Sequence, residues 1–354
     1  MRKILIIIVV AAQLGVLGFM AGEREWVLRT GRSVYLRTAP IDPRDPMRGD
    51  YIRLTYEIAT VPKRLCRDGV RTWFDAKEAI YDSNVRDRRV YAAVRLDQDG
   101  VAELVSLSDQ PPSEGIYLRG RANAIYLSTI DVRFGVEALF MQQGKAREFE
   151  NTMRTTKAGV PLNVEVAVNS HGLAVIKGHR WEPLGITLTL DRSPPASSLG
   201  PRTPRPGLRG VTIELKNHSD ASVAIVDSPG THGLRLVPSR AVSRMEEPTG
   251  WVWVHDAAPP TKPEAGDIKV LKPGESHRVH LDFTSPEWFV RKYGEKNQLG
   301  APTSLETLTE NWNATFRIEY APPSAEECTG LPDADVIRHA RLRSRMFSAA
   351  GGAD

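Results

Sequence analysis

Few residues of this chain have the spacing that catalysis requires. The Gly-x-Ser-x-Gly pattern, which places a serine nucleophile on a sharp turn, is absent, as are phosphate-binding loops, the His-Glu-x-x-His zinc motif and calcium-binding loops. Five of the eight histidines lie within residues 211–323, but His277 and His280 are three residues apart on an expected strand and therefore point to opposite faces. We expect no catalytic residue, no metal site and no cofactor, and we interpret the histidines as surface or turn residues.

One polar cluster could do chemistry. Asp50, Arg53 and Glu57 lie on one expected strand, and Glu137 lies in a later segment. Two carboxyl groups within about 10 Å across a cleft could serve as acid and base in a hydrolase. The same charges could recognise a membrane partner or an envelope polymer. They could also form an ion-paired network that sets the strand register, and we favour this structural interpretation.

The strand that carries this cluster alternates between two kinds of side chain. Residues 38–57 read TAPIDPRDPMRGDYIRLTYE, in which the prolines keep the chain extended, Gly49 permits a tight turn and a strand begins at Asp50. Period-two alternation predicts an apolar face formed by Ile52, Leu54, Tyr56 and Ile58. It predicts an opposite face formed by Tyr51, Arg53, Thr55 and Glu57.

The elements around this strand are mostly strands too. Period-two patterns predict strands over residues 34–37, 50–58, 90–96, 101–107, 116–121, 124–134, 162–168, 173–177 and 186–190. Helices are expected over residues 72–81 and 145–157. We therefore predict a β-rich α+β domain over residues 23–192.

A second unit follows a spacer. Residues 193–210 contain five prolines and few large apolar residues, which predicts a solvated Pro/Arg-rich linker. Residues 211–323 then show about seven short strands separated by turn signals, a pattern typical of an immunoglobulin-like β-sandwich. Trp251 and Trp253 share one face, either in its core or on a sugar-stacking surface. Residues 324–354 form a basic tail with a candidate helix over 336–346.

The N-terminus predicts a membrane anchor. Arg2 and Lys3 precede the apolar run 4–21, which as a helix would cover about 27 Å, close to the hydrocarbon core of a bilayer. A cleavable signal peptide is the alternative, but bulky Phe19 stands where cleavage after Ala21 would need a small residue. We therefore expect residues 1–22 to be an uncleaved anchor. The two basic residues orient the N-terminus to the cytoplasm and the rest of the chain outside it.

The motif strand also resembles a known family. Residues 49–56 read GDYIRLTY and fill every defined position of the motif of the membrane-anchored GDYXXLXY family, which is biochemically uncharacterised. The anchor, the lead-in from Arg37 to Tyr51 and the block 134–137 (FGVE) extend this resemblance over roughly residues 1–190. The family's acidic-Gly element is replaced here by residues 142–145 (QQGK). The resemblance implies topology and fold rather than an activity.

Composition limits the remaining choices. Basic and acidic residues number 47 and 43, and this near balance disfavours nucleic acid as a partner. Cys66 and Cys328 lie in different expected domains and could be buried thiols or a single disulfide. The excess of arginine over lysine favours a GC-rich bacterial genome.

Together these features predict a mainly β, single-pass protein of the inner membrane whose bulk is periplasmic. We expect a non-enzymatic interaction or assembly module of the cell envelope. It would contact the bilayer through residues 4–21 and a second membrane or envelope protein through a motif patch. The patch comprises Gly49, Asp50, Tyr51, Arg53, Leu54, Tyr56, Glu57, Gly135 and Glu137. An envelope hydrolase with a carboxylate site and a glycan-binding sandwich are the alternatives.

Overall fold

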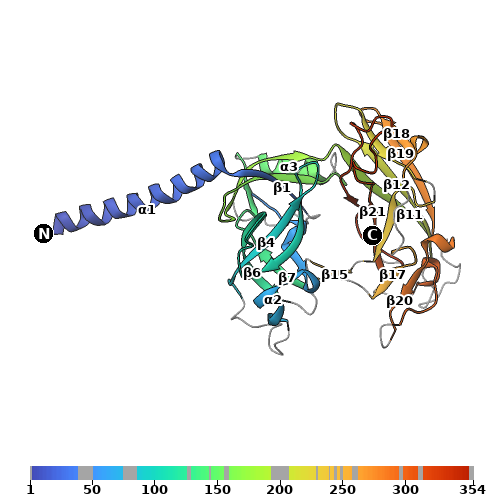
Figure 1. The fold of residues 1–354 in the computed structure, drawn as a ribbon, viewed down its shortest axis with the longest axis horizontal. Helices are drawn as coiled ribbons and strands as arrows, with labels where there is room; N and C mark the ends of the chain where they lie inside the picture. The colour runs from blue at the N-terminus through green and yellow to red at the C-terminus, as the bar shows by residue number, and fades with distance from the viewer. Residues whose placement is uncertain are drawn as a thin grey trace. The chain divides into compact units, whose positions relative to one another are not determined.

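The fold is mainly β, with one long N-terminal helix (Figure 1). The computed structural model describes residues 2–38, 51–74, 86–125, 129–142, 145–154, 159–192, 207–228, 230–238, 240–242, 245–247, 250–256, 262–294, 298–309 and 314–350. Contacts divide the chain into two compact units. The first comprises residues 1–147 and 162–180, and the second comprises residues 148–161 and 181–354.

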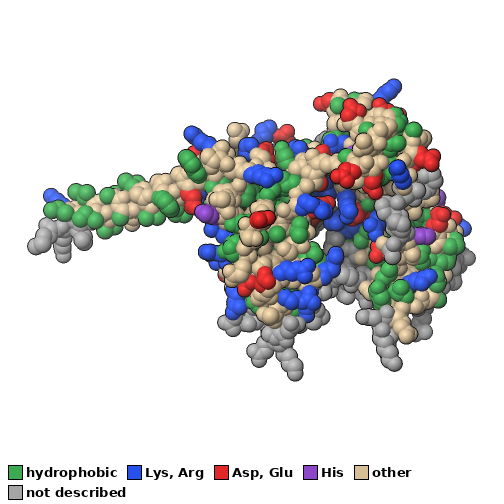
Figure 2. Space-filling view, in the orientation of Figure 1, with side chains coloured by type: hydrophobic (Ala, Val, Ile, Leu, Met, Phe, Trp, Pro, Cys, Tyr) green, Lys and Arg blue, Asp and Glu red, His purple; other side chains and the backbone are tan. Residues whose placement is uncertain are grey.

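Helix α1 (Arg2–Thr30) extends past the expected anchor into the first unit. Residues Ile6–Thr30 form a helix long and apolar enough to cross a membrane, and its most apolar window of 18 residues is 0% buried. Figure 2 shows hydrophobic side chains along this helix. Among the side chains of α1 whose burial is described, the buried one is Val27, near the C-terminal end. The chain then continues directly into β1 (Arg32–Arg37).

The first unit is built from antiparallel sheets. A sheet of order β1-β9-β10 joins β1 to β9 (Leu162–Val168) and β10 (Ala174–Trp181). A larger sheet of order β3-β7-β6-β4-β5 and the pair β2-β8 complete the pattern. Their strands are β2 (Tyr51–Arg53), β3 (Thr60–Pro62), β4 (Arg89–Leu96), β5 (Ala102–Ser108), β6 (Ile116–Ile125), β7 (Thr129–Arg133) and β8 (Ala138–Phe140).

The second unit contains further antiparallel pairs. Its sheets have the orders β11-β12-β19, β13-β18, β14-β21-β22 with β23 on β21, β15-β16 and β17-β20. The strands are β11 (Leu184–Arg192), β12 (Leu208–Asn217), β13 (Val223–Val226), β14 (Leu234–Pro238), β15 (Arg240–Val242), β16 (Met245–Glu247), β17 (Trp251–Trp253), β18 (Ile268–Leu271), β19 (Ser276–Asp282), β20 (Val290–Lys292), β21 (Thr315–Tyr320), β22 (Leu342–Arg343) and β23 (Phe347–Ser348).

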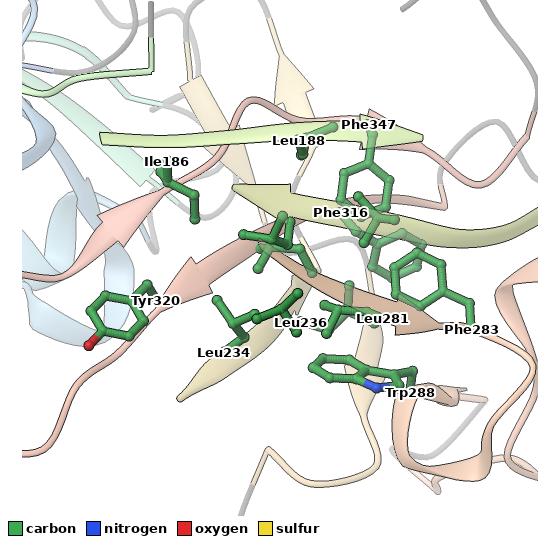
Figure 3. Packing of buried hydrophobic residues seen from close by; sticks show 14 of the residues in the cluster. Ile186, Leu188, Leu234, Leu236, Leu281, Phe283, Trp288, Phe316, Tyr320 and Phe347 are labelled. Atoms are coloured by element: carbon green, nitrogen blue, oxygen red, sulfur yellow. The ribbon is translucent and has the colours of Figure 1, made fainter. Parts of the chain in front are cut away.

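One hydrophobic core links the main sheets of the second unit. Ile186 of β11 and Leu281 of β19 share a buried cluster with Leu236 of β14 and Phe316 of β21 (Figure 3). Aromatic rings fill the same cluster, where the Phe283 and Phe347 centroids are 6.1 Å apart. Side chains from two sheets therefore meet in one core, which is a sandwich-like arrangement.

The expected boundary between the units differs from the observed one. Strand β11 was expected to close the first domain, but it pairs with β12 with Ile186 opposite Leu215. Leu184 and Ile186 are each 1% exposed within the core of the second unit. The chain therefore enters the second unit for the last time at residue 181, because pairing and burial assign β11 to the sheet that follows it. Residues 193–206 of the expected linker lie outside the described ranges.

The helix expected over residues 336–346 is wrong. Ile337 of this segment forms an isolated bridge with Ala224 of β13, and Leu342 and Arg343 pair with β21. The amide of Ser344 donates to the carbonyl of Ile318 at 2.9 Å. Leu342 and Phe347 are buried in the core. The arginines had suggested a solvated helix, but these apolar side chains are placed by sheet pairing instead.

The two short helices agree with expectation only in part. Helix α3 (Lys145–Arg154) begins where the apolar spacing of residues 145–157 predicts it. The helix expected from residue 72 is α2 (Asp68–Trp73), which begins four residues earlier. Residues 75–85 lie outside the described ranges, so the rest of that prediction is not described.

Candidate functional site

The motif strand pairs with the segment that follows the second sequence block. Strand β2 runs antiparallel to β8, with Ile52 opposite Leu139 and Arg53 opposite Ala138. Beyond the strand, the amide of Leu54 donates to the carbonyl of Glu137 at 2.8 Å. The fold thus brings together two blocks that lie about eighty residues apart in the sequence.

The predicted alternation of the motif is confirmed by burial. Ile52, Leu54 and Tyr56 are each 1% exposed and Ile58 is 6% exposed. The expected strand over residues 50–58 is shorter than predicted, because β2 ends at Arg53. Tyr56 instead forms an isolated antiparallel bridge with Thr38, and a 3-10 helix begins at Glu57. The inward face persists although the regular strand does not.

Tyr56 joins the two blocks through its hydroxyl group. The side chain is buried, and Oη donates to the carbonyl oxygen of Val136 at 2.6 Å. Burial, and secondarily the negative charge of Glu137, raises the pKa of Tyr56 well above its ordinary value. The phenol therefore stays protonated and acts as a hydrogen-bond donor.

Glu137 closes a tight turn in the second block. Its carboxylate accepts hydrogen bonds from the amides of Phe134 at 2.5 Å and Gly135 at 3.0 Å. Gly135 has a φ of +81°, a left-handed conformation that favours glycine. We expected Glu137 to join an ion-paired network, but both of its oxygens accept backbone amide hydrogens. Its observed role is to hold the turn that presents the Val136 carbonyl to Tyr56.

The structure describes the predicted patch only in part. Gly49 and Asp50 lie outside the described residues, so the distance from Asp50 to Glu137 is not described. Tyr51 is placed by its backbone, opposite Phe140. Arg53 is exposed, and Phe140 is 78% exposed on the neighbouring strand.

Sequence reasoning missed two contributors to this site. Thr38 pairs with Tyr56, and Val136 contributes a carbonyl rather than a side chain. Thr38 begins the motif lead-in and Val136 lies within the second block, but neither residue type suggests its partner. A backbone carbonyl that accepts a hydrogen bond cannot be recognised from the pattern of side-chain types, because every residue has one.

The second unit contains a polar cluster that the sequence did not predict. The carboxylate of Asp227 lies between two imidazoles, with His232 Nδ1 hydrogen-bonded at 2.6 Å to one oxygen and His277 Nε2 3.0 Å from the other. Across the described ranges, no group of three or more His, Cys, Asp or Glu side chains could hold a metal ion. This cluster connects the segment after β13 to the beginning of β19.

Burial confirms the core interpretation of the paired tryptophans over the sugar-stacking alternative. Trp251 and Trp253 are 8% and 3% exposed, and both belong to the hydrophobic core. The Trp253 ring stacks on Trp288 at a centroid distance of 5.4 Å, and its Nε1 donates to the carbonyl of Glu287 at 2.8 Å. Neither indole face is available to a glycan.

Comparison with known proteins identifies the first half of the chain. Residues 13–178 match the sequence model of the GDYXXLXY protein family. The segment 13–178 belongs to the GDYXXLXY family. The match covers β2, β8 and the turn at residues 134–137, so the described part of the family motif, residues 51–56, belongs to the buried joint described above. No curated protein and no solved structure matches the chain.

Proposed function

We propose that this GDYXXLXY protein is a single-pass inner-membrane protein of the bacterial cell envelope that binds another envelope or membrane protein and has no enzymatic activity. Its N-terminus lies in the cytoplasm, and both units lie on the periplasmic side. The observation that carries the proposal is helix α1, whose apolar window is entirely uncovered. A bilayer would cover an apolar surface of this size.

The orientation rests on the distribution of charge. Arg2 and Lys3 precede the apolar segment, whereas a mixed set, Glu23, Arg24 and Glu25, follows it. Basic residues near the end of a span favour the cytoplasmic side, and acidic residues contribute little. This charge distribution supports the proposal that the chain after α1 lies outside the cytoplasm.

The geometry of Glu137 favours a binding module over a hydrolase. A carboxylate that acts as an acid or base must be free to reach a substrate, but Glu137 already accepts two backbone hydrogen bonds. The buried Trp251 and Trp253 offer no stacking surface to a glycan, which disfavours the glycan-binding alternative. The motif supports the fold, and its exposed neighbours, Arg53 and Phe140, supply the proposed contact surface.

Topology is tested in the native host. Protease added to spheroplasts should digest both units, and the purified product should retain Met1 and require detergent for extraction. A product that begins after Ala21 and dissolves in buffer would contradict the anchor. A chain protected in intact spheroplasts and digested only after lysis would contradict the orientation.

Partner binding needs a separate experiment. A photo-crosslinking amino acid placed at Arg53 or Phe140 in intact membranes should capture one discrete partner. The same group at Val105, which is 50% exposed on β5, serves as the matched control. Identical product patterns at all three positions, or no product from a folded protein, would count against the proposal.

A further inference from the structure

The joint between α1 and the first unit is closely packed. Val27 is 0% exposed, and the amide of Gly31 donates to its carbonyl at 2.8 Å. A Cβ added at Gly31 would lie 2.5 Å from that carbonyl oxygen and 3.1 Å from the Cβ of Ala167. The last turn of α1 therefore packs against the end of β9, without a free linker between helix and sheet.

This joint lies near the surface of the bilayer. Six residues separate Ala21 from Val27, which corresponds to about 9 Å along a helix. The polar layer on each side of the hydrocarbon core is about 5–7 Å thick. Trp26, which is 68% exposed, falls in or at the edge of that layer, where tryptophan is enriched. The surface that buries Val27 therefore lies close to the lipid headgroups.

A defined turn extends from this surface. Arg32 pairs with Val168, so β9 ends beside the joint and β1 leads away from it. After Val168 the chain turns through residues 169–172, at the end of β9 that lies next to the last turn of α1. Its tip, Ser170 and His171, is exposed.

The turn is held by its own hydrogen bonds. The side-chain oxygen of Asn169 accepts from the amides of His171 and Leu173, both at 2.9 Å. Tyr117 donates through Oη to the carbonyl of Ser170 at 2.8 Å. A polar tip fixed in this way suits contact with the polar layer of a membrane.

We infer that α1 is a rigid strut rather than a flexible tether, and that it holds the tip at residues 170–171 against the lipid headgroups. The inference rests on the proposed function, because it requires α1 to span the bilayer. It adds an interaction surface to the anchor, with phosphate-bearing headgroups as the partner.

Two histidines of one hairpin provide the test. His171 lies at the tip, and His179 is exposed toward the other end of β10. His171→Cys and His179→Cys full-length proteins would each carry a bimane label in phosphatidylcholine vesicles. Cys66 and Cys328 are each 1% exposed, and burial raises the pKa of Cys66 to about 11, so the native thiols should resist labelling.

A nitroxide attached to the lipid headgroup should quench the label at 171 several-fold more than the label at 179. Val27→Ala, which loosens the joint, should reduce this difference, whereas Val16→Ala within the apolar segment should preserve it. Equal quenching at both positions in protein that floats with vesicles would overturn the inference alone. Protein that fails to float would overturn the anchor and this inference together.

Discussion

At the scale of single residues, the GDYXXLXY motif acts as a structural joint. Leu54 and Tyr56 bury their side chains, and both also bind the second block through hydrogen bonds. Glu137 and Gly135 shape the acceptor side of that joint. Each of these residues therefore contributes to stability in a way that a local substitution can measure.

Tyr56→Phe should destabilise the protein by about 1–3 kcal/mol, because the buried carbonyl of Val136 loses its hydrogen-bond donor. Urea denaturation in mild detergent measures this loss, and amide hydrogen exchange over residues 51–59 locates it. Tyr117→Phe is the control, since its hydroxyl bonds a more exposed carbonyl. Equal effects of the two substitutions would contradict the joint.

Gly135→Ala should cost about 1–2 kcal/mol, since a left-handed conformation is unfavourable for a residue with a Cβ. A Cβ at this position meets no atom within 4 Å, so the cost comes from the backbone alone. Gly178→Ala, where the nearest atom is 3.7 Å away, should stay within about 0.5 kcal/mol of the parent protein. The same denaturation experiment compares them, and a neutral Gly135→Ala would refute the proposed strain.

At the scale of elements, the C-terminal segment is a structural part of the second unit. Strands β22 and β23 both pair with β21, and the amide of Ala349 donates to the carbonyl of Ala314. The sequence suggested a basic tail because arginines dominate its composition. Two apolar residues of this segment, Leu342 and Phe347, are buried in the core where the segment pairs with β21.

Phe347→Ala should therefore destabilise the second unit by about 3–5 kcal/mol, because the ring contacts Phe283 and Phe316 in the core. Arg345→Ala, at an exposed position two residues earlier, should change the stability by less than about 0.5 kcal/mol. Limited proteolysis followed by mass spectrometry distinguishes them. Similar digestion rates for the two variants would show that the segment is dispensable.

At the scale of the whole molecule, the chain consists of two compact units, with a potential membrane helix joined to the first. Cys66 lies in the first unit and Cys328 in the second, and both thiols are free and buried. The disulfide that the sequence left open is not formed. Packing within each unit, rather than a covalent bridge, accounts for the stability of both.

A maleimide should accordingly modify neither native thiol in the folded protein and both after denaturation without reductant. Intact mass measurement counts the adducts. A Ser170→Cys variant, exposed at the β9–β10 turn, should gain one adduct in the folded state and confirms that the reagent is active. Absence of modification in denatured, unreduced protein would indicate a disulfide.

The amino-acid pattern alone was enough to predict the period-two burial of the motif, the long apolar N-terminal helix and the mainly β architecture. Each of these follows from the order of apolar and polar residues over a short stretch of chain, so no distant contact is needed to predict it. The role of Glu137 could not be predicted from the sequence, because its hydrogen-bond partners are backbone amides, which nearly every residue has.

Which distant segments meet could be read only from the folded chain. In the structure β2 pairs with β8, and Trp251 and Trp253 lie in a core. Strand β11, which was predicted for the first domain, pairs with β12 of the second unit. Many partners satisfy an alternating pattern equally well, and the choice among them depends on the packing and hydrogen bonding of the complete fold. A residue pattern specifies which face is buried, whereas the assembled sheets specify what buries it.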